Sequence, residues 1–204
     1  MEASRQRAII VADGPSAAGF KPPEGVSIFA VKGAINWLDR ADFWFSLDPN
    51  HRTRAMMEIR RPGVRYACAV PPGCVLPPGV ERLERVQLPR FATHPRQKYT
   101  PEWWCWRWDA VPTLSTKQGK INTGNSAWGA LGWAYLLGYR DVLLVGVDGT
   151  SEPRVSDNVP PKDLQHLPYL FESALPQLTL ASVSSLGKVP RVTLEEWLNA
   201  CPRY

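Results

Sequence analysis

The sequence of 204 residues has no long apolar run and few cysteines and histidines, and these absences exclude several classes of protein. No apolar run approaches the roughly 18–20 residues that a membrane span requires. The four cysteines form no C-x-x-C pair, and no histidine stands at ligand spacing from them, which predicts reduced thiols and no metal site. The start of the chain runs from a short polar lead directly into an apolar strand, which predicts no signal peptide. We therefore expect a cytoplasmic protein that does not bind membranes.

Standard nucleotide-binding motifs are also absent. The segment "DGPS" at residues 13–16 has neither the second glycine and lysine of a P-loop nor the spacing of G-x-G-x-x-G. There is no internal repeat and no low-complexity tract. A net charge of +5 permits an anionic partner such as a nucleotide or nucleic acid, although so modest a charge is also common in proteins that bind neither. The length and the apolar content of 44% predict one domain over residues 1–204.

Short apolar runs alternate with helical segments along the chain. Continuous apolar runs of this length, separated by helices, are typical of the buried strands of a parallel sheet. We therefore predict an α/β, Rossmann-like fold, with a mostly parallel sheet and helices on both faces. The runs are Ala8–Asp13, Val26–Val31, Phe43–Asp48, Val64–Val70, Asp141–Asp148 and Leu178–Ser184, with a fifth, edge strand expected at "ERVQL", residues 84–88.

The segment Ala127–Leu137 predicts a helix buried against the sheet, because it has almost no polar face. It follows the polar turn "NTGNS", which supplies residues suited to an N-cap. Free amides and the positive end of the helix dipole at such a turn can bind a phosphate. The alternative is that the turn only caps a core helix.

Three predicted strands end at an aspartate, namely Asp13, Asp48 and Asp148. The carboxyl ends of parallel strands meet at one edge of a sheet, where ligands bind. Each aspartate alone is explained as a turn former, but together they suggest ribose hydroxyls or a magnesium-bound phosphate as ligand.

Three blocks of the sequence resemble a known group of enzymes. "IIVADGPSAAGF" is similar to the "GNGPSL" opening of the family 42 bacterial sialyltransferases and related MptE-like proteins. "KINTGNSAWGALGWAYLLGYRDVLLVGVDG" resembles their "R-I-T-S-G" to "G-I-D" block, and "SVSSLGKVPRVTLEEWL" resembles their C-terminal strand and helix. The pattern is most like that of short phage-encoded members.

This resemblance implies a GT-A-type nucleotide-sugar transferase that needs no metal and no other cofactor. Its glycine-rich turn corresponds to Asp13, Gly14, Pro15 and Ser16 here, and aspartate replaces the family's opening asparagine. Two further family asparagines are replaced by Lys32 and Asp48, so the resemblance does not extend to a sialic acid donor. The remaining nucleotide-binding positions that it implies are Lys120, Asn122, Thr123, Gly124 and Asp148.

The family's general base is a histidine between the "G-I-D" strand and the last strand, a position that only His166 can fill. A histidine titrates near neutral pH and can take the proton of an acceptor hydroxyl. The alternative is a histidine packed on an ordinary helix, and His51 and His94 are weaker candidates.

A tryptophan- and proline-rich segment, residues 89–119, predicts an inserted lid. Aromatic rings among cations can stack a base or sugar, or hold single-stranded nucleic acid, whereas the alternative is a lid that packs its own apolar cluster. Its central residues are Trp103, Trp104, Trp106, Arg107 and Trp108, and the flanking cations are Arg90, Arg96, Lys98, Lys117 and Lys120.

Three hypotheses follow. The first is a glycosyltransferase that uses a nucleotide-sugar and a hydroxyl acceptor, which in a phage could be a modified DNA base in the host cytoplasm. The second is an MptE-like pyrophosphokinase that uses ATP and magnesium held by Asp13, Asp48 and Asp148. The third is a nucleotide- or nucleic-acid-binding module without turnover. The sequence leaves the oligomeric state, the sugar and the acceptor open.

Overall fold

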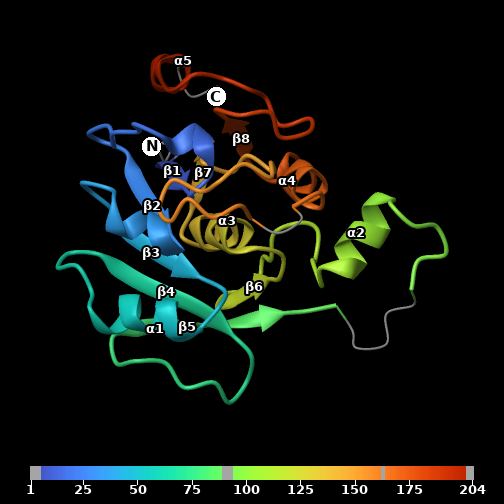
Figure 1. The fold of residues 1–204 in the computed structure, drawn as a ribbon, viewed down its shortest axis with the longest axis horizontal. Coiled ribbons are helices and arrows are strands. Elements are labelled where there is room, and N and C mark those ends of the chain that lie inside the picture. The colour runs from blue at the N-terminus through green and yellow to red at the C-terminus, as the bar shows by residue number, and fades with distance from the viewer. Residues whose placement is uncertain (1–5, 89–93, 162–163, 201–204) are drawn as a thin grey trace, which may run out of the picture.

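The computed structural model describes residues 6–88, 94–161 and 164–200, and within them eight strands form one sheet (Figure 1). The strand order is β6-β5-β4-β3-β2-β1-β7-β8, and every neighbouring pair is parallel. This confirms the α/β, Rossmann-like prediction. The strands are β1 (Gln6–Val11), β2 (Ser27–Val31), β3 (Phe43–Ser46), β4 (Arg65–Val70), β5 (Val80–Val86), β6 (Lys120–Asn122), β7 (Tyr139–Val145) and β8 (Thr179–Ser182).

The central strands are buried on both faces, which explains their continuous apolar sequences. In β1, Ile9 and Ile10 are both fully buried, but they belong to different apolar clusters. Successive side chains of a strand point to opposite faces, so a strand covered on both sides needs apolar residues at every position.

Helices cover both faces of the sheet. Those that pack on the Ile10 face are α3 (Ser126–Leu136) and α4 (Leu167–Ala174), and those on the Ile9 face are α1 (His51–Glu58) and α5 (Leu194–Asn199). Two short 3-10 helices, η1 (Pro15–Ala17) and η2 (Lys32–Asn36), follow β1 and β2. The remaining helix, α2 (Pro101–Arg107), lies at the side of the molecule, beyond β6 and α4 (Figure 1).

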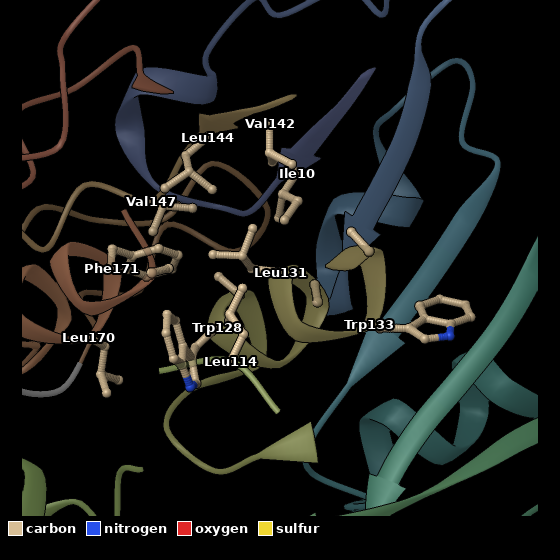
Figure 2. Packing of buried hydrophobic residues seen from close by; sticks show 14 of the residues in the cluster. Ile10, Leu114, Trp128, Leu131, Trp133, Val142, Leu144, Val147, Leu170 and Phe171 are labelled. Atoms are coloured by element: carbon tan, nitrogen blue, oxygen red, sulfur yellow. The ribbon is translucent and has the colours of Figure 1, made fainter. Parts of the chain in front are cut away.

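The central helix α3 is buried on almost all sides. Figure 2 shows Leu131 pointing toward Ile10, while Trp128 and Trp133 leave the helix in different directions. Trp128 meets the edge of Phe171 in α4 at 5.5 Å, and Trp133 meets the edge of Phe29 in β2 at 5.7 Å. The absence of a polar face in its sequence is therefore explained by contacts with both the sheet and α4.

Two elements differ from the sequence-based expectation. Strand β5 is not at the sheet edge, because β6 pairs with it through Glu84, Arg85 and Val86. Strand β6 escaped prediction because it has three residues and its one buried side chain is Ile121, too short a pattern to show a period. Within the described residues, no helix has the length and apolar character to cross a lipid bilayer.

The strand order defines where a ligand can bind. The chain builds the sheet outward from β1 through β2 to β6, and it then returns to place β7 on the other side of β1. The connections after β1 and β7 therefore diverge, which opens a crevice at the carboxyl ends of these strands.

Candidate functional site

A cleft with a volume of about 200 Å³ lies at this switch point. It is formed by the loops that follow β1, β2 and β7, the first turn of α3, and the segment before α4. Its lining residues are Ala12, Asp13, Gly14, Pro15, Val31, Lys32, Asn125, Ser126, Ala127, Gly146, Val147, Asp148, Gly149, Thr150, Glu152, Arg154, Pro161, Leu164 and Leu167. We call this group of residues the cleft.

The turn after β1 is tied to the end of β7 by hydrogen bonds. The Ser16 amide donates to Asp148 Oδ2 at 2.8 Å, and the Ser16 hydroxyl donates to Asp148 Oδ1. The amide of Gly146 donates to the Ser16 hydroxyl oxygen at 3.0 Å. Both Asp148 oxygens thus accept hydrogen bonds from the "DGPS" turn, so this carboxylate shapes the cleft wall.

Two glycines allow the loops after β1 and β7 to approach each other. The Gly14 amide donates to the Gly146 carbonyl at 2.9 Å, and a Cβ added at Gly14 would lie 2.5 Å from that oxygen. Gly146 has φ +70°, and a Cβ there would lie 2.2 Å from the Ala12 carbonyl oxygen. Any larger residue would separate the two loops, so the glycines set the width of the crevice.

Asp13 is the carboxylate whose environment is most unusual. Trp37 Nε1 donates to Asp13 Oδ1 at 2.9 Å. Burial raises the pKa of Asp13 above its ordinary value, an effect that hydrogen bonds from Trp37 and Ser156 and the charge of Arg154 only partly oppose. Among the described residues whose pKa is clearly shifted, Asp13 is the acid that lines the cleft.

Lys32 brings a positive charge to the cleft immediately after β2. Its backbone has φ +49°, an uncommon conformation for a lysine, and its carbonyl accepts a hydrogen bond from Trp44 Nε1 at 2.9 Å. Its ammonium group pairs with Asp48, which is half exposed and does not line the cleft. The pair is open to solvent, so Lys32 can exchange Asp48 for an anionic ligand.

The amino-terminal turn of α3 reaches the cleft. The Asn125 side chain accepts a hydrogen bond from the Trp128 amide at 2.8 Å and caps the helix. The Ser126 hydroxyl accepts one from the Leu47 amide at 3.1 Å and so ties the helix to the end of β3. The amides of Ser126 and Ala127 precede the capped amide, and both residues line the cleft.

The structure does not bring Lys120, Asn122, Thr123 or Gly124 to the cleft. Lys120 lies in edge strand β6, where its Nζ is 3.0 Å from Glu84 Oε1. The Thr123 hydroxyl donates to the Asp109 carbonyl at 2.6 Å, and the Asn122 amide donates to the Thr113 carbonyl at 2.9 Å. These residues hold the returning end of the 89–119 segment, so the "NTGNS" turn contributes to the cleft through Asn125 and Ser126 instead.

His166 also lies outside the cleft lining. Its ring is 2% exposed and stacks on Trp108 with ring centroids 5.5 Å apart. A role as general base would require this ring to become accessible, and its neighbours Leu164 and Leu167 are the residues that reach the cleft. His51 begins α1 and is exposed, and His94 is exposed and packs against Trp106.

The described part of the predicted lid, residues 94–119, contributes no residue to the cleft. Trp104 and Cys105 are buried, and Trp103 packs edge-on against Trp104 at 4.6 Å. Arg107 is exposed. The indoles therefore form largely their own apolar cluster beside α4, as the structural alternative stated. Arg90 lies outside the described residues.

Sequence analysis missed the residues supplied by the loop after β7. Glu152 and Arg154 line the cleft, and the amide of Val155 donates to the Asp13 carbonyl at 2.7 Å. Arg154 also forms an ion pair with Asp157 at 2.8 Å. The signal available in the sequence was the polar stretch "GTSEPRVSDN" directly after the strongest strand, a position at which loops carry function.

The three strand-end aspartates do not converge on one point. Asp13 accepts from Trp37, Asp48 pairs with Lys32, and Asp148 accepts from Ser16. Over residues 6–88, 94–161 and 164–200, no group of three acidic, histidine or cysteine side chains is placed to hold a metal ion.

Comparison with known proteins places the fold in context. No family model and no curated protein sequence matches the chain. Among solved structures, the chain is similar to the MAf glycosyltransferase from Magnetospirillum magneticum AMB-1, with a TM-score of 0.53 and 14% sequence identity. The similarity covers 94% of this chain and 34% of that one, so the chain spans about a third of the length of the larger protein. At this identity the likeness establishes a common fold.

Proposed function

We propose that this chain is a nucleotide-sugar-dependent glycosyltransferase that binds the donor nucleotide in the cleft and transfers the sugar to a hydroxyl acceptor. The observation that carries the proposal is the meeting, at the switch point of the sheet, of the α3 amino terminus with Lys32 and Asp13. The fold that the chain shares with a glycosyltransferase supports the same class of reaction. A modified DNA base is one form that the acceptor hydroxyl can take.

The charges of the cleft suit a nucleoside phosphate. The amides of Ser126 and Ala127 at the start of α3 supply hydrogen-bond donors and the positive end of the helix dipole. Lys32 and Arg154 add positive charge from two other loops. These groups stabilise the negative charge that grows on the leaving phosphate when the bond to the sugar breaks, so the proposed mechanism needs no metal.

The pyrophosphokinase alternative has less support. It requires magnesium held by Asp13, Asp48 and Asp148, whereas these side chains have three different partners and Asp48 does not line the cleft. A module that binds nucleotide without turnover remains an outcome of the experiments below.

The proposal is tested by a thermal-shift screen with CMP, CDP, UDP, GDP, ADP and ATP, each with and without magnesium. A ligand at about a hundred times its dissociation constant stabilises the native state by about 2.7 kcal/mol, which such a screen detects. We expect one mono- or diphosphate to stabilise the protein without magnesium. A response confined to ATP with magnesium would favour the pyrophosphokinase, and no response would refute nucleotide binding.

Two lysine variants test where the phosphate binds. We expect Lys32→Ala to weaken binding of the identified nucleotide about tenfold, because loss of one charge-assisted hydrogen bond costs about 1.5 kcal/mol. Lys120→Ala decides between the two locations: the sequence resemblance predicts a similar loss, whereas the cleft geometry predicts none. Lys188, whose side chain is 85% exposed, supplies the control variant Lys188→Ala. Calorimetric titration measures all four proteins.

A further inference from the structure

A second hollow adjoins the cleft and shares three residues with it. This hollow has a volume of about 620 Å³ and lies between η2, α1 and the loop after β7; we call it the η2–α1 groove. Asp13, Lys32 and Arg154 line both hollows. The other lining residues of the groove are Gly33, Asn36, Asn50, Arg52, Thr53, Ala55, Met56, Ile59, Ser156 and Asp157.

The lining of the groove is mixed in a way that suits a saccharide. The amide side chains of Asn36 and Asn50 are exposed on its polar side. Met56 is half-buried, and Ile59 is 83% exposed, which is unusual for an apolar side chain of this size. A sugar presents hydroxyls at its rim and apolar C–H faces, so a groove with both kinds of group can bind it.

Asp13 is held firmly at the boundary of the two hollows. Its Oδ1 accepts the hydrogen bond from Trp37 Nε1 at 2.9 Å. Its Oδ2 lies close to η2, because a Cβ added at Gly33 would be 2.7 Å from this oxygen and 3.0 Å from the Ser156 hydroxyl oxygen. Glycine at position 33 therefore leaves the space that this carboxylate occupies beside the groove.

We propose, on the basis of the transferase function proposed above, that the η2–α1 groove binds a saccharide acceptor and that Asp13 is the general base for its hydroxyl. A group that lines both hollows can reach an acceptor oxygen in one of them while the donor lies in the other. His166, which lines neither hollow, is not required.

The proposed step balances in atoms and electrons. The Asp13 carboxylate takes the proton of the acceptor hydroxyl while the hydroxyl oxygen forms a bond to the anomeric carbon of the donor sugar. The bond from that carbon to the phosphate oxygen breaks, and its electron pair leaves with the nucleoside phosphate. Lys32, Arg154 and the α3 amino terminus stabilise this leaving group, and Asp13 afterwards releases its proton to solvent.

The environment of Asp13 suits a base that works near neutral pH. Its pKa is raised chiefly by burial, which brings it closer to the operating pH than that of an ordinary aspartate. The charged groups that surround it or line the two hollows with it are Arg154, Asp157, Lys32, Arg52, Glu152 and Asp148.

The first test compares wild type with Asp13→Asn. Release of nucleoside phosphate is followed from UDP-glucose, GDP-mannose and CMP-N-acetylneuraminate, with lactose and N-acetylglucosamine as acceptor probes, and nucleotide affinity is measured in parallel. We expect kcat to fall at least about a hundredfold, the usual contribution of a general base, while the donor KM changes less than about threefold. The rising limb of the wild-type pH–rate profile is expected to disappear in the variant.

The second test blocks the groove. Ala55 is exposed on α1 and lines the groove, and Glu58 is exposed on the same helix but does not line it. We expect Ala55→Trp to lower transfer to the saccharides at least about tenfold. The matched variant Glu58→Trp is expected to retain wild-type transfer.

The outcomes separate this inference from the proposed function. A wild-type protein that binds no nucleotide, or that binds one and releases none from any donor, refutes the transferase and this inference with it. A wild-type protein that turns over while Asp13→Asn keeps its kcat refutes the role of Asp13 alone. Loss of donor affinity in Asp13→Asn would make Asp13 a binding residue, and equal transfer by Ala55→Trp and Glu58→Trp would place the acceptor elsewhere.

Discussion

At the scale of single residues, two aspartates at equivalent strand ends have been given different tasks by their surroundings. Asp148 receives the amide and hydroxyl of Ser16 and so closes the turn after β1. Asp13 is held by an indole and is buried enough that its pKa is raised. The difference arises from hydrogen-bond donors supplied by other strands, and it makes Asp13 the more reactive of the two.

We expect Asp13→Asn to stabilise the ligand-free protein near neutral pH. A carboxyl group whose pKa is raised in the folded state binds its proton more tightly there, so wild-type stability falls as the pH rises from the unfolded pKa through the folded one. Asparagine does not ionise, so the free-energy advantage of the variant should be near zero at about pH 4 and positive at about pH 8. Urea unfolding at several pH values measures it, and a difference that does not change with pH would contradict the raised pKa.

At the scale of elements, α3 decides the shape of both the core and the cleft. Its small residues let it lie close to the sheet, and Gly129 is the point of closest approach, where a Cβ would be 2.5 Å from Phe45 Cε1. Phe45 is fully buried in β3 and has no space to move into. This packing fixes the position of the helix terminus that lines the cleft.

Two glycines of α3 should respond oppositely to alanine. Alanine favours a helix over glycine by about 1 kcal/mol, but overpacking a core costs about 1–3 kcal/mol. Gly129→Ala should therefore destabilise the protein by about 1–2 kcal/mol. At Gly132 the nearest atom to an added Cβ is Ile121 Cδ1 at 3.6 Å, so Gly132→Ala should be neutral or stabilising by up to about 1 kcal/mol. Urea unfolding compares them, and equal effects would mean that α3 does not pack as described.

At the scale of the whole molecule, one cluster joins the two ends of the described chain. Arg7 at the start of β1 forms an ion pair with Asp141 of β7 at 2.8 Å, and its guanidinium lies 3.8 Å from the ring centroid of Trp197 in α5. Trp197 Nε1 donates to the other oxygen of Asp141 at 2.9 Å. The carboxylate thus links two central strands to the last helix, on the face opposite α3.

Asp141→Asn tests this link. The change leaves the mostly buried Arg7 without its carboxylate, and we expect a loss of about 2 kcal/mol, less than for a fully buried pair because both side chains retain some exposure. Asp39→Asn, at an exposed position, is the control and should change stability by less than about 0.5 kcal/mol. Equal stability of the two variants would show that α5 is held by its apolar contacts alone.

Much of the fold could be predicted because its signals are local. Apolar runs at residues 8–11 and 141–147 have no other stable place than a sheet covered on both faces, and the apolar segment 127–137 has none other than a buried helix. Strand β6 and the inner position of β5 could not be predicted, because pairing between these strands depends on backbone hydrogen bonds and leaves little trace in three residues.

The candidate site divides in the same way. The sequence alone determined that strand ends bearing Asp13, Asp48 and Asp148 would meet at one edge, since a parallel sheet aligns its carboxyl ends. Only the tertiary structure decided that Asp148 binds Ser16, that Lys120 and His166 lie outside the cleft, and that Arg154 lines it. These outcomes depend on contacts between segments more than a hundred residues apart, such as Ser16 with Asp148, or on how loops cross the sheet edge, and neither is encoded in local pattern.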